Sequence, residues 1–264
     1  MTATNLDQIV SYLDQYLRIA DLPDSGTAVN GLQVANTGTI GRVVAAVDIS
    51  QAAINDIVTR RKHRVATGST EAPPLVLVHH GLFWDGSYAV TGRRYRRLKA
   101  LLDADIAVYG AHIPLDVHPE VGNNAVLARE LELADPFPFG DYKGVLLGIG
   151  GDRAMPRADL AGWLERRLKT SVRLIPGGPE TTRRIGVITG AAGSMILAAR
   201  DAGCDTFVTG EGAHHTFFDA MEFGVNVLYA GHYATEQVGV EALARHLSER
   251  FGLPWEFVDH PTGM

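Results

Sequence analysis

Two short segments of the chain have the residue types of a metal site. His79 and His80 are adjacent and follow an apolar, β-rich run, and His232 is followed four residues later by Glu236. Imidazole nitrogens combined with carboxylate oxygens suit zinc, iron or manganese, whereas calcium and magnesium prefer shells of oxygen alone. Two such ions, about 3.5 to 4 Å apart, would polarise a substrate and activate a water molecule for hydrolysis.

The spacing of His232 and Glu236 occurs once before. His112 and Asp116 are also four residues apart, and His232 and Glu236 repeat this pattern of histidine and carboxylate 120 positions later. Two further segments recur at matching places: residues 42–47 and 75–80 in the first half, and residues 184–189 and 205–210 in the second. The repetition predicts two related halves whose strand-end side chains converge on one cleft, with coincidence of short patterns as the alternative.

Strands alternate with helices along most of the chain. Residues 4–19 have the period of an amphipathic helix behind a cap at Thr4 or Asn5, and residues 42–49 predict a strand followed by a cap at Ser50 and a helix. A strand is predicted over 74–78, so that both histidines after it turn into the space beyond the sheet. This pattern indicates an α/β protein with two related lobes and mixed sheets flanked by helices.

The best candidate for a lobe boundary is the turn-rich segment 135–140, Asp-Pro-Phe-Pro-Phe-Gly. It predicts a first lobe over residues 1–135 that carries His79, His80 and Asp116. The second lobe, over 136–264, would carry His232 and Glu236 and has no room for a large inserted domain.

Each motif has a structural alternative when it is taken alone. Successive side chains of a strand point to opposite faces, so His79 and His80 could be a core histidine beside an exposed one. The His-x-x-x-Glu pattern also has many chance matches. The combination of the motifs at matching strand ends favours a metal site.

Composition restricts the partners. The net charge of −6 gives no positive field that would hold nucleic acid, so a nucleic-acid partner is not expected. The single cysteine, Cys204, excludes an internal disulfide and a cysteine-rich metal site. No apolar run approaches the ~18 residues of a membrane span and no signal peptide is recognisable, so we expect a cytoplasmic protein without a membrane partner.

Five segments of the sequence resemble the Nif-three-like family, whose members are called GTP cyclohydrolase I type 2 homologues. They follow the family's order along the chain: residues 30–34, 78–84, 110–116, 209–216 and 231–236. The resemblance implies a Nif-three-like fold, a homohexamer and a dinuclear metal centre with Glu236 bridging two divalent ions. The ligands that it implies are His79, His80, Asp116, His232 and Glu236.

Two departures from the family pattern fall near these residues. The run after Asp116 is about one residue longer and adds His118, and His214 stands where histidine is less expected. The preferred substrate therefore cannot be transferred from the family.

His215 is the predicted catalytic residue, because an imidazole can exchange a proton with bound water or a leaving group; a surface or supporting histidine is the alternative. His112 could be a residue that holds Asp116. Glu211 is interpreted as a helix cap, with a hydrogen bond to a ligand as the alternative. Residues 189–194 are interpreted as a tight turn because they lack the lysine of a P-loop, with backbone N–H groups that hold a phosphate as the alternative. Residues 93–97 are interpreted as a solvated basic helix face, with attraction of a phosphorylated substrate as the alternative.

These features predict a metal-dependent hydrolase of a small, nucleotide-like substrate, similar to GTP cyclohydrolase. The alternative is a non-catalytic metal-binding or scaffold protein, because ligands do not by themselves establish turnover. The two functions differ in what His215 does: only a hydrolase should lose turnover, and keep its metals, when this imidazole is removed.

Overall fold

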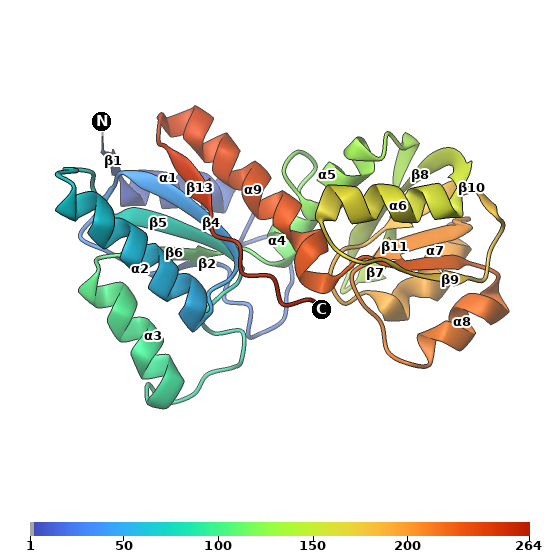
Figure 1. Ribbon diagram of the computed structural model, residues 1–264, viewed down its shortest axis with the longest axis horizontal. Coiled ribbons are helices and arrows are strands. Elements are labelled where there is room, and N and C mark those ends of the chain that lie inside the picture. The colour runs from blue at the N-terminus through green and yellow to red at the C-terminus, as the bar shows by residue number, and fades with distance from the viewer. Residues whose placement is uncertain (1–2) are drawn as a thin grey trace. The chain divides into compact units, whose positions relative to one another are not determined.

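The computed structural model describes residues 3–264 and shows a mixed α/β fold (Figure 1). The chain forms two compact units, which are described separately below. Unit 1 consists of the chain up to Leu115 together with Val240–His260, and unit 2 of Asp116–Gly239 with the last four residues. No helix within the described residues is both long and apolar enough to cross a membrane.

Unit 1 is built on a five-stranded sheet with the order β13-β4-β5-β6-β2. Four strands are parallel, and β2 at the edge runs antiparallel to β6. The strands are β2 (Gly31–Val34), β4 (Arg42–Asp48), β5 (Pro74–His80), β6 (Ala107–Gly110) and β13 (Trp255–Phe257). A separate two-stranded sheet is formed by β1 (Thr4–Asn5) and β3 (Thr39–Ile40).

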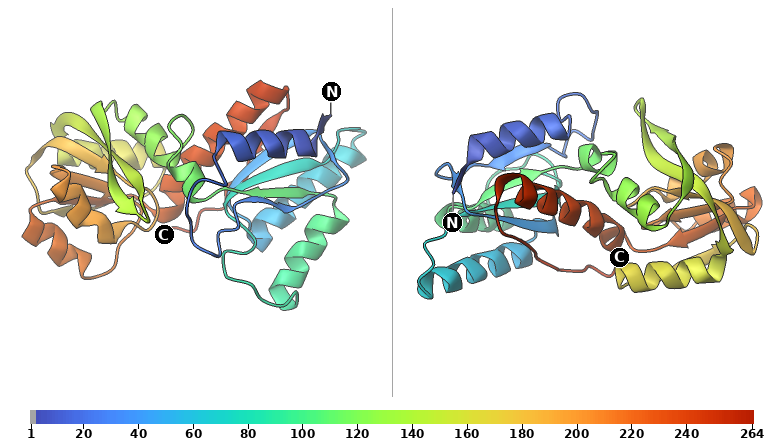
Figure 2. Two further views of the ribbon diagram at one scale, coloured as in Figure 1. Left: turned by 180° about the vertical axis from the view of Figure 1, so that it is seen from behind. Right: turned by 90° about the horizontal axis from the view of Figure 1, so that it is seen from above.

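Helices cover both faces of the unit 1 sheet (Figures 1 and 2). α2 (Gln51–Ala66) and α3 (Gly92–Asp103) lie on one face, and α1 (Leu6–Tyr16) lies on the other. The predicted caps are present: the Asn5 side chain accepts from Gln8 N, and the Ser50 hydroxyl accepts from Ala53 N. Alternate strand residues such as Val44, Val76 and Val78 are buried in the core with α2 and α3, as expected for a sheet that is covered on both faces.

Unit 2 contains a six-stranded sheet with the order β7-β8-β10-β11-β12-β9. Its strands are β7 (Ala134–Tyr142), β8 (Val145–Pro156), β9 (Arg173–Pro176), β10 (Thr181–Val187), β11 (Thr206–Thr209) and β12 (Asn226–Tyr229). Its helices are α5 (Asn123–Glu130), α6 (Arg157–Leu168), a 3-10 turn at Gly193–Met195, α7 (Ile196–Asp201) and α8 (Thr216–Phe223). α4 (Ile113–Asp116) and α9 (His232–Phe251) connect the units along the chain.

The two large sheets share one connectivity. In unit 1, β4, β5 and β6 are parallel and an earlier strand, β2, pairs antiparallel with β6. In unit 2, β10, β11 and β12 are parallel and an earlier strand, β9, pairs antiparallel with β12. The predicted α/β fold with two related halves is thus confirmed by topology, and unit 2 adds the hairpin of β7 and β8.

The boundary predicted at residue 135 differs from the observed division. The segment that reads as a turn, Asp135 to Gly140, lies in β7 and pairs with β8. β7 is an edge strand, where prolines are tolerated because the missing N–H need not join the ladder. The chain enters unit 2 earlier, at Asp116, and returns to unit 1 at Val240 because β13 completes the first sheet beside β4.

Candidate metal centre

His79 and His80 are the last two residues of β5, so the predicted strand end at Val78 is wrong by two residues. Strand alternation sends the two side chains to different neighbours. His79 Nδ1 lies 3.0 Å from the carbonyl oxygen of Ala111, and His80 Nδ1 lies 3.0 Å from Asp48 Oδ1. Asp48 is directly opposite His80 in the ladder between β4 and β5. Both histidines are buried.

These contacts decide which ring nitrogen carries the proton. A carbonyl or carboxylate oxygen can only accept, so His79 and His80 must each donate from Nδ1. In the neutral imidazole the lone pair is then at Nε2. This is the arrangement of metal-binding histidines, whose second ring nitrogen donates to a carbonyl or carboxylate group.

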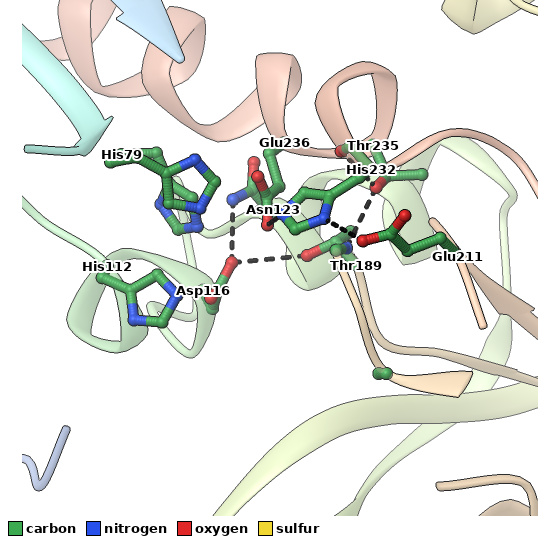
Figure 3. Close-up of polar contacts among 12 residues, drawn as sticks. His79, His112, Asp116, Asn123, Thr189, Glu211, His232, Thr235 and Glu236 are labelled. Carbon is green, nitrogen blue, oxygen red and sulfur yellow. Dashed lines mark hydrogen bonds and ion pairs between the residues drawn. The ribbon is translucent and has the colours of Figure 1, made fainter. Parts of the chain in front are cut away.

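His112 joins this pair as a third imidazole of unit 1. One ligand atom from each of His79, His80 and His112 lies within 4.8 Å of the others, and the rings of His79 and His112 lie close together (Figure 3). His112 Nδ1 donates to Asp24 Oδ1 over 2.8 Å. Its Nε2 therefore also carries the lone pair in the neutral form, so His112 is a candidate ligand and more than the supporting residue suggested by the sequence.

Asp24 and Asn30 fix the position of His112. Asp24 also accepts from Ile113 N and from the Asn30 amide, and Asn30 Oδ1 accepts from His112 N. Burial raises the pKa of Asp24, but its bonds to His112 and Asn30 outweigh burial and keep the pKa below its usual value. Asp24 was not found from the sequence because it lies in a loop far from His112 in the chain.

In unit 2, His232 and Glu236 lie on the first turns of α9, where four-residue spacing places them on one face. His232 Nδ1 is 2.8 Å from Glu211 Oε1, and His232 Nε2 is 3.2 Å from Glu236 Oε1 (Figure 3). Glu236 is only 3% exposed. Glu211 is therefore not the helix cap that the sequence favours, because its carboxylate orients the imidazole of His232.

Two carboxylates determine the charge of His232 in the metal-free protein. Burial lowers the pKa of His232, but the hydrogen bonds and charges of Glu236 and Glu211 raise it to about 9. A metal ion that binds to His232 Nε2 must displace the proton on that nitrogen. Glu236 stabilises this proton with its negative oxygen, so His232 and Glu236 together hold a proton at the position that a metal ion would take.

This competition predicts the pH dependence of metal binding. Below pH about 9 the imidazole of His232 is protonated, so we expect metal affinity to rise with pH, by at most about tenfold per unit, and to level off above that value. Calorimetric titrations in buffers of different ionisation enthalpy should show proton release near neutral pH. Glu211→Gln should lower the pKa of His232 and reduce the release; equal release in both proteins would contradict this account.

Asp116 is held by a buried polar network at the start of unit 2. Its Oδ1 accepts from Asn123 Nδ2 at 2.8 Å and from Thr189 Oγ1 at 3.3 Å. Asn123 and Asn124 are fully buried, and the side-chain oxygen Oδ1 of Asn123 accepts from Gly239 N on α9. The sequence does not reveal these roles, because they depend on contacts with Thr189 and Gly239, which are distant in the chain.

The turn after β10 forms a cradle for Glu236. Gly190 has φ +69°, and a Cβ atom added there would lie 2.3 Å from Glu236 Oε1. Its carbonyl oxygen accepts from the backbone N–H groups of Gly210 and Glu211, and its own N–H donates to Thr235. The tight turn predicted over residues 189–194 is present, and its backbone approaches the candidate ligand closely.

Gly190→Ala should therefore displace the Glu236 carboxylate. The added methyl group collides with Oε1 and the left-handed backbone costs about 1 kcal/mol more for alanine. We expect a stability loss of about 1 to 3 kcal/mol in denaturant unfolding and weaker metal binding. Gly224→Ala is the control, because Gly224 is also left-handed but has no atom within contact of the added Cβ.

The remaining predicted residues are less closely tied to these groups. His215 is exposed at the start of α8, and no hydrogen bond joins it to His232 or Glu236 among the described residues. His118 Nδ1 accepts from the N–H groups of Glu120 and Val121, so its proton is on Nε2, the reverse of His79, His80 and His112. The catalytic role of His215 stays a prediction.

The basic segment of residues 93–97 is only partly the solvated face that was predicted. Arg94 is buried and donates to Asp85 and to the carbonyl oxygens of Gly86 and Tyr88. This arginine holds the loop after β5 in place.

Comparison with known proteins gives consistent matches over the whole chain. A model of the family Duf34/NIF3 (NGG1p interacting factor 3) matches residues 4–262. A protein of Deinococcus radiodurans named GTP cyclohydrolase 1 type 2 homolog is 41% identical over 260 residues, covering 98% of this chain and 94% of its own. One of the same name from Pyrococcus abyssi is 40% identical, with coverage of 98% and 99%.

A solved structure agrees with these matches. The crystal structure of the protein TTHA1606 from Thermus thermophilus superposes with a TM-score of 0.86 at 40% identity, covering 99% of this chain and all of the other.

Proposed function

The chain belongs to the Duf34/NIF3 family, and from this premise we propose that it is a metal-dependent hydrolase acting on a nucleotide-like substrate. The observation that carries the proposal is a hydrogen-bond pattern that four histidines share. His79, His80, His112 and His232 each have Nδ1 bonded to a carbonyl or carboxylate oxygen. That arrangement leaves Nε2 as the nitrogen that can coordinate a metal ion, which is what a metal ligand requires.

The proposed cofactor is a pair of divalent ions. In unit 1 the donors would be His79 and His80, and in unit 2 Asp116, His232 and Glu236, with His112 as a further donor. Mixed imidazole and carboxylate donors favour zinc, iron or manganese. The residues present fit such ions. In unit 1, His79, His80 and His112 each bring a ligand atom within 4.8 Å of the others, and in unit 2 His232 Nε2 and Glu236 Oε1 are 3.2 Å apart.

Bound ions of this kind polarise a carbonyl or phosphoryl oxygen and lower the pKa of water, which is the chemistry of hydrolysis. The chain's own groups would bind the ions, orient the ligands and exchange protons. Glu236 can serve two cations with its two oxygens, while Glu211 and Asp48 hold the imidazoles of His232 and His80. His215 would exchange the proton with the leaving group or water.

The substrate class rests on the relatives, several of which are named GTP cyclohydrolase 1 type 2 homolog. A purine nucleotide offers both an electrophilic ring carbon and phosphoryl groups to a hydrolase. Assembly as a homohexamer in the cytoplasm belongs to the same proposal, and light scattering at about six times the chain mass would support the assembly.

The test is turnover by protein that has been loaded with each of the three metals. We expect hydrolysis of at least one member of a panel of purine nucleotides and phosphoesters. His215→Ala should lower kcat by about 100-fold or more while metal content stays the same, and His214→Ala, its exposed neighbour, should not. Full metal occupancy without turnover of any panel member would favour a non-catalytic metal-binding protein instead.

A further inference from the structure

An exposed tryptophan lies against the histidine cluster of unit 1. The Trp84 ring centroid is 4.4 Å from that of His112 and 4.9 Å from that of His80. Trp84 nevertheless keeps 38% of its surface accessible. Part of the indole therefore orients the imidazoles, and the rest of its apolar surface is open beside the candidate ligand atoms.

The loop that carries Trp84 is held from both ends. Leu82 N donates to Gln33 Oε1 at 2.8 Å, and the Gln33 amide packs closely on Gly81, where an added Cβ would lie 2.1 Å from Gln33 Nε2. After Trp84, the buried Arg94 ties down Asp85 and the carbonyl oxygens that follow. The exposed indole is thus fixed before any ligand binds, which lowers the entropy cost of stacking.

Arg97, on the helix that follows the loop, is a cation with incomplete pairing. Its Nε is buried and has no hydrogen-bond partner. Burial and then the charge of Arg93 lower the pKa of Arg97, while Asp85 and Asp48 raise it. Arginine nevertheless stays charged, and a half-buried guanidinium can pair with an added anion through its terminal nitrogens.

Arg97 belongs to the same part of unit 1 as the histidines. Asp85 follows Trp84 directly in the chain, and Asp48 accepts from His80. Arg97 follows Arg93 and Arg94 by four and three residues on α3, so it lies on the helix face whose arginines pair with Asp85. An aromatic surface and an incompletely paired cation therefore flank the end of β5 that carries the candidate ligands.

We propose that Trp84 and Arg97 form a ligand subsite beside His80, in which the indole stacks on the planar heterocycle of a nucleoside phosphate and the guanidinium pairs with its phosphate. The subsite rests on the proposed function, since it names the groups that would select a nucleotide for the metal centre. Stacking on an indole tolerates any planar base, and an arginine matches the geometry of a phosphate. Specificity would then come from the combination of base and phosphate.

Equilibrium binding of three probes separates the two contributions. GMP carries both groups, guanosine only the base, and ribose 5-phosphate only the phosphate. Calorimetry should show that Trp84→Leu weakens GMP and guanosine by about tenfold and leaves ribose 5-phosphate unchanged. Arg97→Met should weaken GMP and ribose 5-phosphate by about tenfold and leave guanosine unchanged.

Two neighbouring exposed residues supply matched controls. Tyr88→Leu removes an aromatic ring from the same loop, and Arg96→Met removes a positive charge from the same helix. Neither should change the affinity for any probe. Trp84→Phe should restore most of the binding lost in Trp84→Leu, which guards against a variant that simply fails to fold.

The metal content and turnover of every protein, measured alongside, test the subsite and the hydrolase function independently. If the variants weaken only the expected probes but the wild-type protein shows no turnover, the subsite is supported and the hydrolase function is rejected. Failure of wild-type protein to bind GMP would overturn the subsite even if the metals and turnover are present. Equal weakening of all three probes by Trp84→Leu, with loss of metal, would mean that the indole only supports the imidazoles, and that result would also overturn it.

Discussion

We expect Glu236→Ala to abolish most of the divalent-metal binding that we propose for this protein. Glu236 is almost completely buried, faces His232 across 3.2 Å and packs against the backbone of Gly190. It offers two charged oxygens from a helix turn, on the same face as an imidazole. Removal of a residue that merely supports a ligand already weakens metal binding by about 10- to 100-fold, so we expect at least 100-fold here.

Elemental analysis of protein purified without chelator measures this directly. Wild-type protein should carry about two equivalents per chain if both proposed ions are present. Gln237→Ala, at the neighbouring position of α9, should keep the wild-type amount. Glu236→Gln keeps the shape but loses the charge and should resemble the alanine variant. A Glu236→Ala protein with unchanged metal content would exclude this carboxylate as a ligand.

Asn124→Ala will destabilise unit 2 by about 3 kcal/mol or more. The Asn124 side chain is fully buried and joins three backbone groups: it accepts from Thr189 N and donates to the carbonyl oxygens of Leu147 and Asp116. Alanine leaves all three without this partner, and each buried, unmade hydrogen bond costs about 1 to 3 kcal/mol. Because Thr189 precedes the Gly190 cradle, metal affinity should fall as well.

Denaturant unfolding with chelator present measures the first effect without a contribution from bound metal. Asn55→Ala is the control, since Asn55 is exposed on α2 and a surface change of this kind is usually within about 0.5 kcal/mol of neutral. A stability loss for Asn124→Ala no larger than that of Asn55→Ala would mean that water replaces the Asn124 amide as partner of the three backbone groups. That result would contradict the prediction.

The sequence predicted the elements better than it predicted their ends. Local signals were sufficient where a helix or strand is defined by its own period and cap, as at Asn5 and Ser50. They failed at β7, because its Pro-rich sequence is typical of a turn and only pairing with β8 makes it a strand. They also failed at His80, whose place in the strand depends on Asp48 in the neighbouring strand.

The same limit applies to the internal repeat. The sequence match set residues 75–80 against 205–210, which pairs His79 with Thr209. In the ladders, however, Leu77 is opposite Tyr109 and Thr209 is opposite Tyr229. Tyr109 and Tyr229 are 120 positions apart and occupy matching places in the two halves. Leu77 therefore corresponds to Thr209, and His79 to Glu211. A shift of two residues leaves every side chain on its original face, so a pattern of period two cannot detect it.

The residues that orient the candidate ligands were the least accessible to sequence analysis. Asp24, Asn124 and Glu211 act through contacts with residues far away in the chain. The ligand types were visible because chemistry restricts them to a few residues. The supporting groups can be any acceptor that folding brings within hydrogen-bond distance.

Because unit 1 includes Val240–His260, its last strand is synthesised after most of unit 2. Unit 2 is nearly continuous, whereas the sheet of unit 1 lacks β13 until residues 255–257 have left the ribosome. Until then β4 is an open edge, and Arg42, Arg60 and Arg64 lack the carboxylate of Glu256 that they approach in the finished protein. Glu71 still pairs with Arg42 and Arg64, and Asp56 with Arg60, but two carboxylates leave an excess of positive charge on the three arginines. This excess would repel another nascent chain from the edge. The arginines would thus protect the first unit while its last strand is still being made.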